Sequence, residues 1–276
     1  MMNPVSILIL TKNEEVDLPG CIQSISWSDD IHVLDSCSTD RTVEIAKSMG
    51  ATVTQRPFDN WSSHQNWALD NLPFKHEWVV YLDADERMTP ELKDAVIRAV
   101  QSPGDKIAFR VVRRDFFFDR WLKHVQTTST YVRLFKPGSI RYERVVNPVT
   151  NVHGPAGQIE GYLDHFPFSK GIDHWFARHN SYSKLEAEQI LLDEASGAKP
   201  SLKLALTADT PQERRRHQKL LFYRLPCRPF LKFLIVYVFK RGFLDGAPGF
   251  RYACMTGIYE YMIKLKVLEL RAKGKR

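Results

Sequence analysis

The sequence of 276 residues predicts an α/β fold, with a mostly parallel central sheet flanked by helices. Short apolar runs of strand length recur along the first half of the chain. Most of them lead through a polar loop into a stretch with apolar residues at helical spacing. Strands that alternate with helices in this way lie parallel and are joined by right-handed crossovers.

The elements follow one another in a regular order. Thr89 and Pro90 have the pattern of an N-cap followed by proline at the first helical position, and Gly50 and Gly197 are expected to end two other helices. After residue 112 the pattern loosens into short strands and long loops, which often shape binding sites. The expected strands are residues 5–10, 31–34, 51–54, 78–82 and 107–112, and the expected helices are residues 16–25, 42–49, 63–72, 89–100 and 173–196.

The charge is distributed unevenly along the chain. Residues 199–276 carry 18 Lys and Arg against 5 Asp and Glu, whereas the residues before them carry 21 against 27. The two parts are therefore expected to meet different partners. The four cysteines are scattered without a CxxC pair, which favours reduced, structural thiols. The first ten residues lack a basic segment and lead directly into a strand, so we do not expect a signal peptide.

An apolar run at residues 230–239 lies within the basic region. It is too short to cross a bilayer, which needs about 20 apolar residues. Aromatic and aliphatic side chains interleaved with basic ones fit a helix that lies on an anionic membrane surface. A helix packed in the core of the domain is the alternative. We therefore expect a first domain at residues 1–198 and a basic, amphipathic, membrane-associating helical region at residues 199–276.

Acidic residues gather where the expected strands end. The fourth strand runs directly into Asp83, Ala84, Asp85 and Glu86, in what we expect to be a short loop before the next helix. Ligands bind at the carboxyl ends of strands in open α/β sheets, and two carboxylates one residue apart can share a hard divalent cation or a ribose. Acids that complement the dipole of the following helix are the alternative.

Three of these loops together resemble a known family. The segments TKNEE at residues 11–15, LDSCSTDRT at 34–42 and LDADE at 82–86 resemble glycosyltransferase family 2 in order and separation. The resemblance covers residues 4 to about 180. It is closest to the bacterial branch with lipopolysaccharide-core glucosyltransferases, which also carry segments similar to RLF at 133–135, WFARHNSYS at 175–183 and KRGFLDGAPG at 240–249.

The resemblance implies an inverting enzyme with the GT-A nucleotide-sugar fold, its nucleotide-binding half at about residues 1–115 and its acceptor half at about 116–198. It also implies a Mg²⁺ or Mn²⁺ ion that bridges the donor diphosphate. Ser36 stands where the family usually has a second acid, and Arg56 is a candidate to replace a cation that relatives carry near Gln65. The implied nucleotide-sugar-binding residues are Thr11, Asn13, Glu14, Asp35, Ser36, Gln65, Asp83 and Ala84, and the implied metal ligands are Asp83 and Asp85.

An inverting transfer also needs a general base for the acceptor hydroxyl. Related sequences carry an acid where this chain has Pro148, and proline cannot act as a base. Glu143 is the nearest acid and our candidate, with Asp115 and Asp164 as alternatives. His165 and His153 are further candidates to approach the metal or the diphosphate.

The predicted function is metal-dependent, inverting transfer of a sugar from a nucleotide donor, most readily a UDP-sugar, to a lipid-linked or lipopolysaccharide-type glycan of the cell envelope. The basic region would hold the enzyme peripherally on the cytoplasmic face of the bacterial inner membrane. A sugar nucleotidyltransferase is disfavoured because the TKNEE loop is acidic where that class needs a glycine-rich basic loop. Two alternatives stay open: a catalytically inactive membrane scaffold, and a nucleic-acid-binding module that uses RRRHQK at residues 214–219, although no nucleic acid is expected as a partner.

Overall fold

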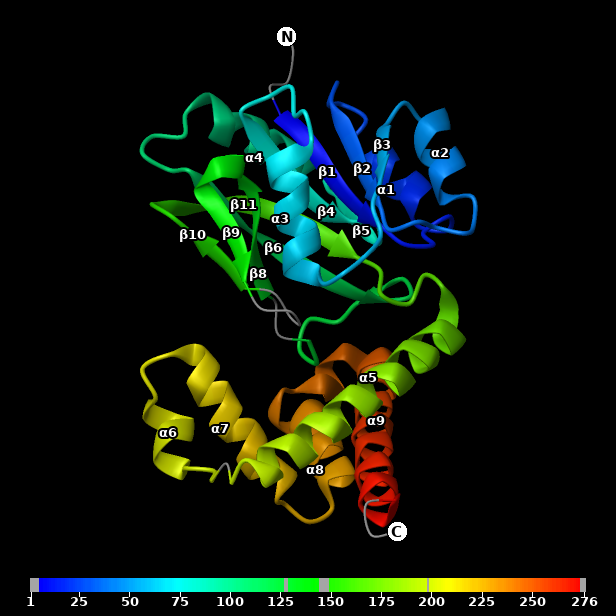
Figure 1. The fold of residues 1–276 in the computed structure, drawn as a ribbon, viewed down its shortest axis with the longest axis vertical. Helices are drawn as coiled ribbons and strands as arrows, with labels where there is room; N and C mark the ends of the chain where they lie inside the picture. Colours follow the sequence, from blue (N-terminus) through cyan, green and yellow to red (C-terminus); the bar gives the residue numbers. More distant parts are fainter. Residues whose placement is uncertain (1–4, 127–128, 144–148, 198, 274–276) are drawn as a thin grey trace. The chain divides into compact units, whose positions relative to one another are not determined.

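The computed structural model describes residues 5–126, 129–143, 149–197 and 199–273 (Figure 1). The chain divides into two compact units. One comprises Met1–Trp121 and Thr128–Lys170, and we call it the α/β unit. The other comprises Leu122–Thr127 and Gly171–Arg276, and we call it the helical unit.

The parallel part of the sheet lies in the first third of the α/β unit. Strands β3, β2, β1 and β4 are neighbours in that order, and all three pairs are parallel. Each strand lies within one residue of its predicted bounds. The bounds are Val5–Thr11 for β1, Ile31–Asp35 for β2, Thr52–Gln55 for β3 and Trp78–Asp83 for β4.

The sheet continues beyond β4 with mixed polarity. Strand β8 (Ser129–Phe135) is antiparallel to both β4 and β6 (Ala108–Phe117), and β11 (Ala156–His165) runs parallel to β6. The prediction of a strand at 107–112 was too short, since β6 continues through ten residues with Asp115 and Phe117 buried. The remaining strands are β5 (Glu86–Met88) on β11, β7 (Arg120–Trp121) on β6, and the separate pair β9 (Ile140–Glu143) and β10 (Val149–Val152).

The placement of Glu86 in a loop before the next helix was wrong. Glu86 opens the short strand β5, which pairs antiparallel with the end of β11, with Glu86 opposite His165. The side chain of Glu86 is completely buried. A charged residue in a three-residue strand carries no periodic pattern, so only the pairing with β11 defines this element.

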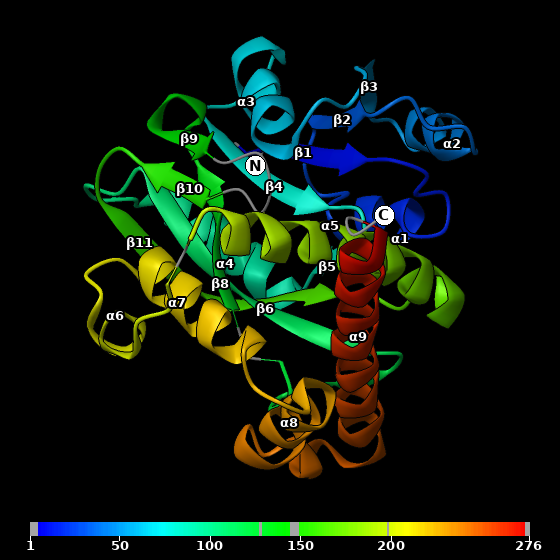
Figure 2. The same ribbon diagram turned by 60° about the horizontal axis from the view of Figure 1, so that its bottom comes forward.

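Helices cover both faces of the sheet (Figures 1 and 2). Alternate residues of β1 point to opposite faces: Ile7 and Ile9 share a core with α1, α2 and α4, whereas Leu8 and Leu10 share a core with α3. The Thr89 hydroxyl accepts a hydrogen bond from the Leu92 N–H, which confirms the predicted cap. The helices are α1 (Leu18–Ser24), α2 (Thr42–Ser48), α3 (Trp61–Asn71) and α4 (Pro90–Gln101).

The helical unit is built around two long helices. Helix α5 (Gly171–Ala195) packs along α9 (Gly246–Lys273) through Ala187, Ile190 and Ile263, with Val267 in the same cluster. Helix α5 therefore groups with the C-terminal helices, whereas the expected boundary at residue 198 placed it in the first domain. Along the chain, α5 and α9 are separated by α6 (Leu202–Thr207), α7 (Pro211–Tyr223), α8 (Arg228–Leu234), the π-helical segment η2 (Ile235–Phe239) and the 3₁₀ turn η3 (Gly242–Asp245).

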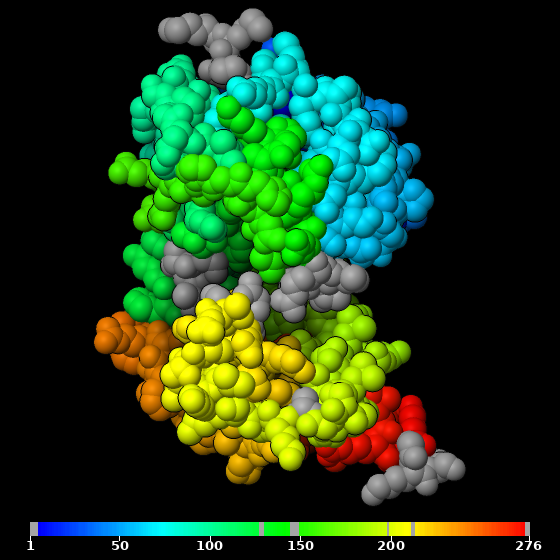
Figure 3. All heavy atoms as spheres, turned by 60° about the vertical axis from the view of Figure 1, so that its left-hand side comes forward, coloured from blue at the N-terminus to red at the C-terminus, as the bar shows by residue number. Residues whose placement is uncertain are grey.

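The surface of α6 and α7 is the yellow area of Figure 3. Among the described residues, none of the helices combines the length and apolarity that crossing a membrane requires.

Candidate active site

The ends of the parallel strands bring the predicted acids into line. In the register of the sheet, Thr11 pairs with Asp35 and Leu10 pairs with Asp83. The Thr11 hydroxyl donates to Asp35 Oδ1 at 2.9 Å, and the Ser38 N–H and the Gln55 side-chain amide donate to Asp35 Oδ2 at 2.8 and 3.0 Å. Burial acts to raise the pKa of Asp35, but these hydrogen bonds outweigh it and lower the pKa. Asp35 is therefore a fixed, ionised acceptor.

Ser36, which follows Asp35, belongs to a buried polar cluster with His64 and Arg56. An arginine can only donate, so His64 Nδ1 accepts from Arg56 Nη1 at 2.9 Å, and His64 Nε2–H donates to the Ser36 hydroxyl at 3.1 Å. Arg56 also forms an ion pair with Asp59 at 2.8 Å. The Arg56 guanidinium is thus engaged beside His64. The next residue of α3, Gln65, is buried, and its Oε1 has no hydrogen-bond partner within the part of the chain that the structure describes.

The loop after β1 is tied to two other segments. Asn13 has a φ of 56° in the left-handed region, and its side-chain oxygen accepts from the Thr39 N–H at 2.8 Å. Glu14 Oε1 lies 2.6 Å from Lys170 Nζ, which also donates to the Asn13 carbonyl at 2.7 Å. Burial raises the pKa of Glu14 to about 7, although Lys170 opposes the increase. Lys170 thereby joins the loop after β11 to the loop after β1.

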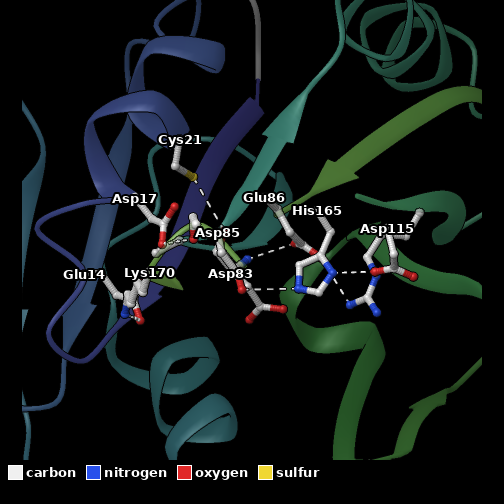
Figure 4. Close-up of polar contacts among 12 residues, drawn as sticks. Glu14, Asp17, Cys21, Asp83, Asp85, Glu86, Asp115, His165 and Lys170 are labelled. Atoms are coloured by element: carbon white, nitrogen blue, oxygen red, sulfur yellow. Dashed lines mark hydrogen bonds and ion pairs between the residues drawn. The ribbon is translucent and has the colours of Figure 1, made fainter. Parts of the chain in front are cut away.

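The acids that follow β4 lie in different environments (Figure 4). The Asp83 carboxylate accepts from the Tyr81 hydroxyl and, at 2.8 Å, from Arg133 Nη2. Arg133 Nη2 also donates to Glu86 Oε1 at 2.6 Å. Burial raises the pKa of Glu86 and Arg133 opposes it. Asp83 and Asp85 keep 36% and 22% of their side-chain surface exposed, whereas Glu86 is inaccessible.

A histidine lies between two carboxylates at the end of β11. His165 Nε2 is 3.2 Å from Asp85 Oδ2, and His165 Nδ1 contacts Asp115 Oδ1 (Figure 4). Burial acts to lower the pKa of His165, but Asp85 and Asp115 outweigh it and raise the pKa to about 9. In the absence of other ligands, His165 is therefore a cation that holds the Asp85 carboxylate in place.

The donor set fits a hard divalent cation only in part. Among the described residues, no three His, Cys, Asp or Glu side chains converge as a complete metal cage. Mg²⁺ and Mn²⁺ are commonly held by one or two carboxylates, with waters and substrate phosphates completing the shell. The partly exposed Asp83 and Asp85 match that incomplete protein shell. Ala84 between them is buried, and its carbonyl accepts from Arg87.

The candidate bases have different surroundings. Asp164 is held by Arg114 through two hydrogen bonds of 2.6 and 2.8 Å. Asp115 is buried against His165. Glu143 is exposed at the end of β9, opposite Val149 of β10. Pro148 lies outside the described residues, and the His153 N–H donates to the Ser139 carbonyl at 2.9 Å.

Sequence reasoning missed two residues of this site. Arg133 was noted only as part of the RLF segment, although a cation at a buried position of an apolar strand near several acids is itself a signal of a buried ion pair. Lys170 lies in a loop 156 residues after Glu14. No local pattern relates the two.

The acids lie at the carboxyl ends of parallel strands, and the sheet continues beyond them with both parallel and antiparallel pairs. This is the arrangement of a GT-A glycosyltransferase that uses a nucleotide-sugar. The chain belongs to glycosyl transferase family 2, whose sequence profile matches residues 6–161. Similar curated proteins include the lipopolysaccharide core biosynthesis glycosyltransferase LpsC of Rhizobium meliloti, which is 26% identical over 98% of this chain and 93% of its own length. An uncharacterized glycosyltransferase of Rickettsia typhi is 24% identical over 99% of this chain and 90% of its own length.

Similar solved structures cover the chain to different extents. TarS of S. aureus, residues 1–349 in complex with UDP-GlcNAc, is 14% identical, with 93% of this chain and 91% of that chain covered and a TM-score of 0.45. Glucosyl-3-phosphoglycerate synthase of Mycobacterium tuberculosis, in complex with Mn²⁺, UDP and glucosyl-3-phosphoglycerate, is 23% identical, with 40% and 44% covered and a TM-score of 0.35.

Proposed function

We propose that this glycosyltransferase transfers a sugar, with inversion, from a UDP-sugar, and that the transfer requires Mg²⁺ or Mn²⁺. The observation that carries the proposal is the Asp83–Asp85 pair at the end of β4, with Asp83 one residue out of register with Asp35, two strands away. A fixed carboxylate such as Asp35 accepts well from an imide N–H or from ribose hydroxyls. Asn13, Glu14, Ser36 and Gln65 would border the same nucleotide.

Asp85, together with Asp83, would hold the divalent cation. When bound, the cation would offset negative charge on the departing nucleoside diphosphate. Arg133 and Tyr81 fix the orientation of the Asp83 carboxylate through hydrogen bonds. The loop that contains Asp85 is also fixed, because the Phe166 N–H donates to the Asp85 carbonyl at 2.9 Å. These contacts preorganise the two carboxylates before any ligand arrives.

Glu143 would take the proton from the acceptor hydroxyl. Its exposure leaves it accessible to a substrate. The adjacent Tyr142 packs edge-on against Tyr81, with ring centroids 6.4 Å apart, and the Tyr81 hydroxyl donates to Asp83. These contacts link β9, the strand that ends at Glu143, to the Asp83 carboxylate.

The acceptor would be a lipid-linked or lipopolysaccharide-type glycan of the cell envelope. The similarity to LpsC over nearly the whole chain supports this choice, as does the net charge of +13 over residues 199–276. Such a charge attracts anionic lipid head groups, and it supports a peripheral position on the cytoplasmic face of the inner membrane.

The experiment that tests the donor assignment is thermal unfolding with UDP, GDP, CDP or dTDP, each with and without Mn²⁺. A ligand that binds only the native state raises the melting temperature. We expect stabilisation by UDP that depends on Mn²⁺ and that Asp85→Ala abolishes. Asp94→Ala, which removes an exposed acid of α4, is the matched control and should retain it. A metal-independent response, or none, would contradict the proposal, and retention on RNA would favour the nucleic-acid-binding alternative.

A further inference from the structure

An exposed aromatic patch covers one part of the helical unit. It consists of side chains from α8, η2, η3 and the start of α9, four segments that pack on one another and whose ribbons lie in the orange part of Figure 2. Phe239 is 79% exposed and Phe230 is 61% exposed. We call this surface the aromatic patch; its residues are Phe230, Val238, Phe239, Phe243, Leu244 and Phe250, each at least 48% exposed.

Ring contacts connect Phe243 and Phe250, two residues of the patch, through Tyr237. The ring centroid of Tyr237 lies 6.4 Å from that of Phe243 and 5.5 Å from that of Phe250. Phe233 stacks on Tyr237 at 5.4 Å and contacts Phe250 at 5.8 Å. The partly buried rings thus support the exposed ones from below. Soluble monomers rarely expose an apolar surface of this kind without using it.

Tight backbone packing fixes the patch to the unit. A Cβ on Gly249 would lie 2.1 Å from the Gly242 carbonyl, and one on Gly242 would lie 2.7 Å from the Val236 carbonyl. Only glycine allows η2, η3 and α9 to approach so closely. The exposed side chains therefore project from a rigid base.

The charges around the patch have one sign. Residues 225–251 contain five basic side chains and a single acid, Asp245. The Asp245 side chain is only 3% exposed. It accepts from the N–H groups of His124 and Val125 at 3.0 Å each, so the acid is turned inward. The charged side chains that this segment exposes, which include Arg241 and Arg251, are cationic.

We propose that the aromatic patch inserts shallowly into the surface of an anionic lipid bilayer. This proposal rests on the membrane association proposed above and assigns it to particular residues. Large aromatic side chains bordered by arginines match the boundary between acyl chains and anionic head groups. A second copy of the chain fits less well, because self-pairing of the patch would bring Arg241 and Arg251 close to like charges.

The direct test is co-sedimentation of the full chain with vesicles of phosphatidylethanolamine that contain about one-third phosphatidylglycerol. The double substitution Phe239→Ser and Leu244→Ser should weaken partitioning by about tenfold or more, because it removes two exposed apolar side chains from the patch. The matched control is Leu202→Ser with Leu206→Ser, since these leucines of α6 are 67% and 66% exposed but lie outside the patch. The control should bind like the unchanged chain.

Two further variants probe the mode of binding. Arg241→Gln with Arg251→Gln should lower binding to the anionic vesicles and make the remainder less sensitive to salt. Phe239→Trp should add an emission component that shifts to the blue with vesicles and is quenched by lipids brominated on their acyl chains. Because residue 239 is so exposed, this substitution does not depend on repacking of the core.

The readouts separate this inference from the proposed donor chemistry. Stabilisation by UDP and Mn²⁺ should be the same in the patch variants and in the unchanged chain. If the patch variants lose vesicle binding although no nucleotide stabilises the protein, the inference stands and the donor assignment fails. The inference is overturned if the unchanged chain does not bind anionic vesicles, or if the Phe239→Ser, Leu244→Ser variant binds them as well as the Leu202→Ser, Leu206→Ser control does. It is also overturned if light scattering reveals a dimer that the patch substitutions disrupt.

Discussion

Arg133 binds Asp83 and Glu86 through a single nitrogen, Nη2, at 2.8 and 2.6 Å. The guanidinium also lies over the Tyr81 ring, 4.5 Å from its centroid. Glu86 is completely buried, so the ion pair has little access to water. The same interaction that neutralises a core carboxylate therefore orients a carboxylate of the candidate metal site.

Replacement of Arg133 by methionine should destabilise the protein strongly. Arg133→Met keeps much of the side-chain volume but leaves Glu86 buried without its closest cation, which typically costs about 3–5 kcal/mol. Urea unfolding monitored by circular dichroism measures the change. Adding Glu86→Gln should recover part of the loss. Arg98→Met, which alters an exposed arginine of α4, should change the free energy of unfolding by less than about 0.5 kcal/mol. Equal stability of the Arg133 and Arg98 variants would contradict this account.

Glu14 should make the protein less stable as the pH rises. Burial raises the pKa of Glu14 to about 7 from an ordinary value of 4.5. Between these values the folded state holds a proton that the unfolded state has released, so the free energy of unfolding falls with increasing pH. Glu14→Gln should make this slope shallower and be more stable than the unchanged chain above pH 7, by roughly 1–3 kcal/mol.

Urea unfolding between pH 4.5 and pH 8 measures the effect of Glu14. Glu160→Gln, at an exposed position of β11, is the control and should leave the slope unchanged. If the slope of Glu14→Gln equalled that of the unchanged chain, other buried acids such as Glu86 would account for it.

The tautomer of His64 should depend on Arg56. Burial lowers the pKa of His64, and the charge of Arg56 lowers it further. Arg56→Met removes that charge and frees Asp59 to act as an anion, so the pKa of His64 should rise. Nitrogen-15 NMR of the imidazole measures both the pKa and the tautomer, with the proton expected on Nε2 in the unchanged chain. A proton on Nδ1 would contradict the assignment of Ser36 as its acceptor.

The strand ends were predictable because alternation of strands and helices determines them. A parallel strand followed by a crossover must place its last residue at one rim of the sheet. Thr11, Asp35 and Asp83 could therefore be grouped from the sequence alone, and the register confirms the grouping. The basic, aromatic character of the C-terminal region was equally visible, since it depends only on composition.

The contacts between these acids and their partners were not predictable. Arg133 reaches Asp83 because β8 inserts antiparallel between β4 and β6, and no local pattern specifies that insertion. His165 meets Asp115 because β11 pairs parallel with β6 at that register. Each of these contacts joins residues 50 positions apart in the sequence and depends on the order of the strands in the sheet. Propensities and hydrophobic periodicity describe only neighbouring residues.

The assignment of Glu143 as general base leads to the last prediction. Glu143→Gln should lower sugar transfer by about 100-fold to 10,000-fold, because general-base catalysis contributes about that much. Stabilisation by UDP and Mn²⁺ should be unchanged, since the substitution leaves the acids of the strand ends intact. Transfer of radiolabel from the UDP-sugar to a bacterial glycolipid extract measures the rate, with Glu160→Gln as the control.

Asp164 and Asp115 are the two alternatives to Glu143 as general base, and substituting them provides the result that would contradict its assignment. Asp164 is committed to Arg114 and Asp115 to His165. Substituting either by asparagine should therefore act mainly through stability. If Asp164→Asn or Asp115→Asn abolished transfer with its melting temperature and UDP response intact, while Glu143→Gln stayed active, the proton would be taken by the paired acid. In that case the ion pair would have to open when the acceptor binds.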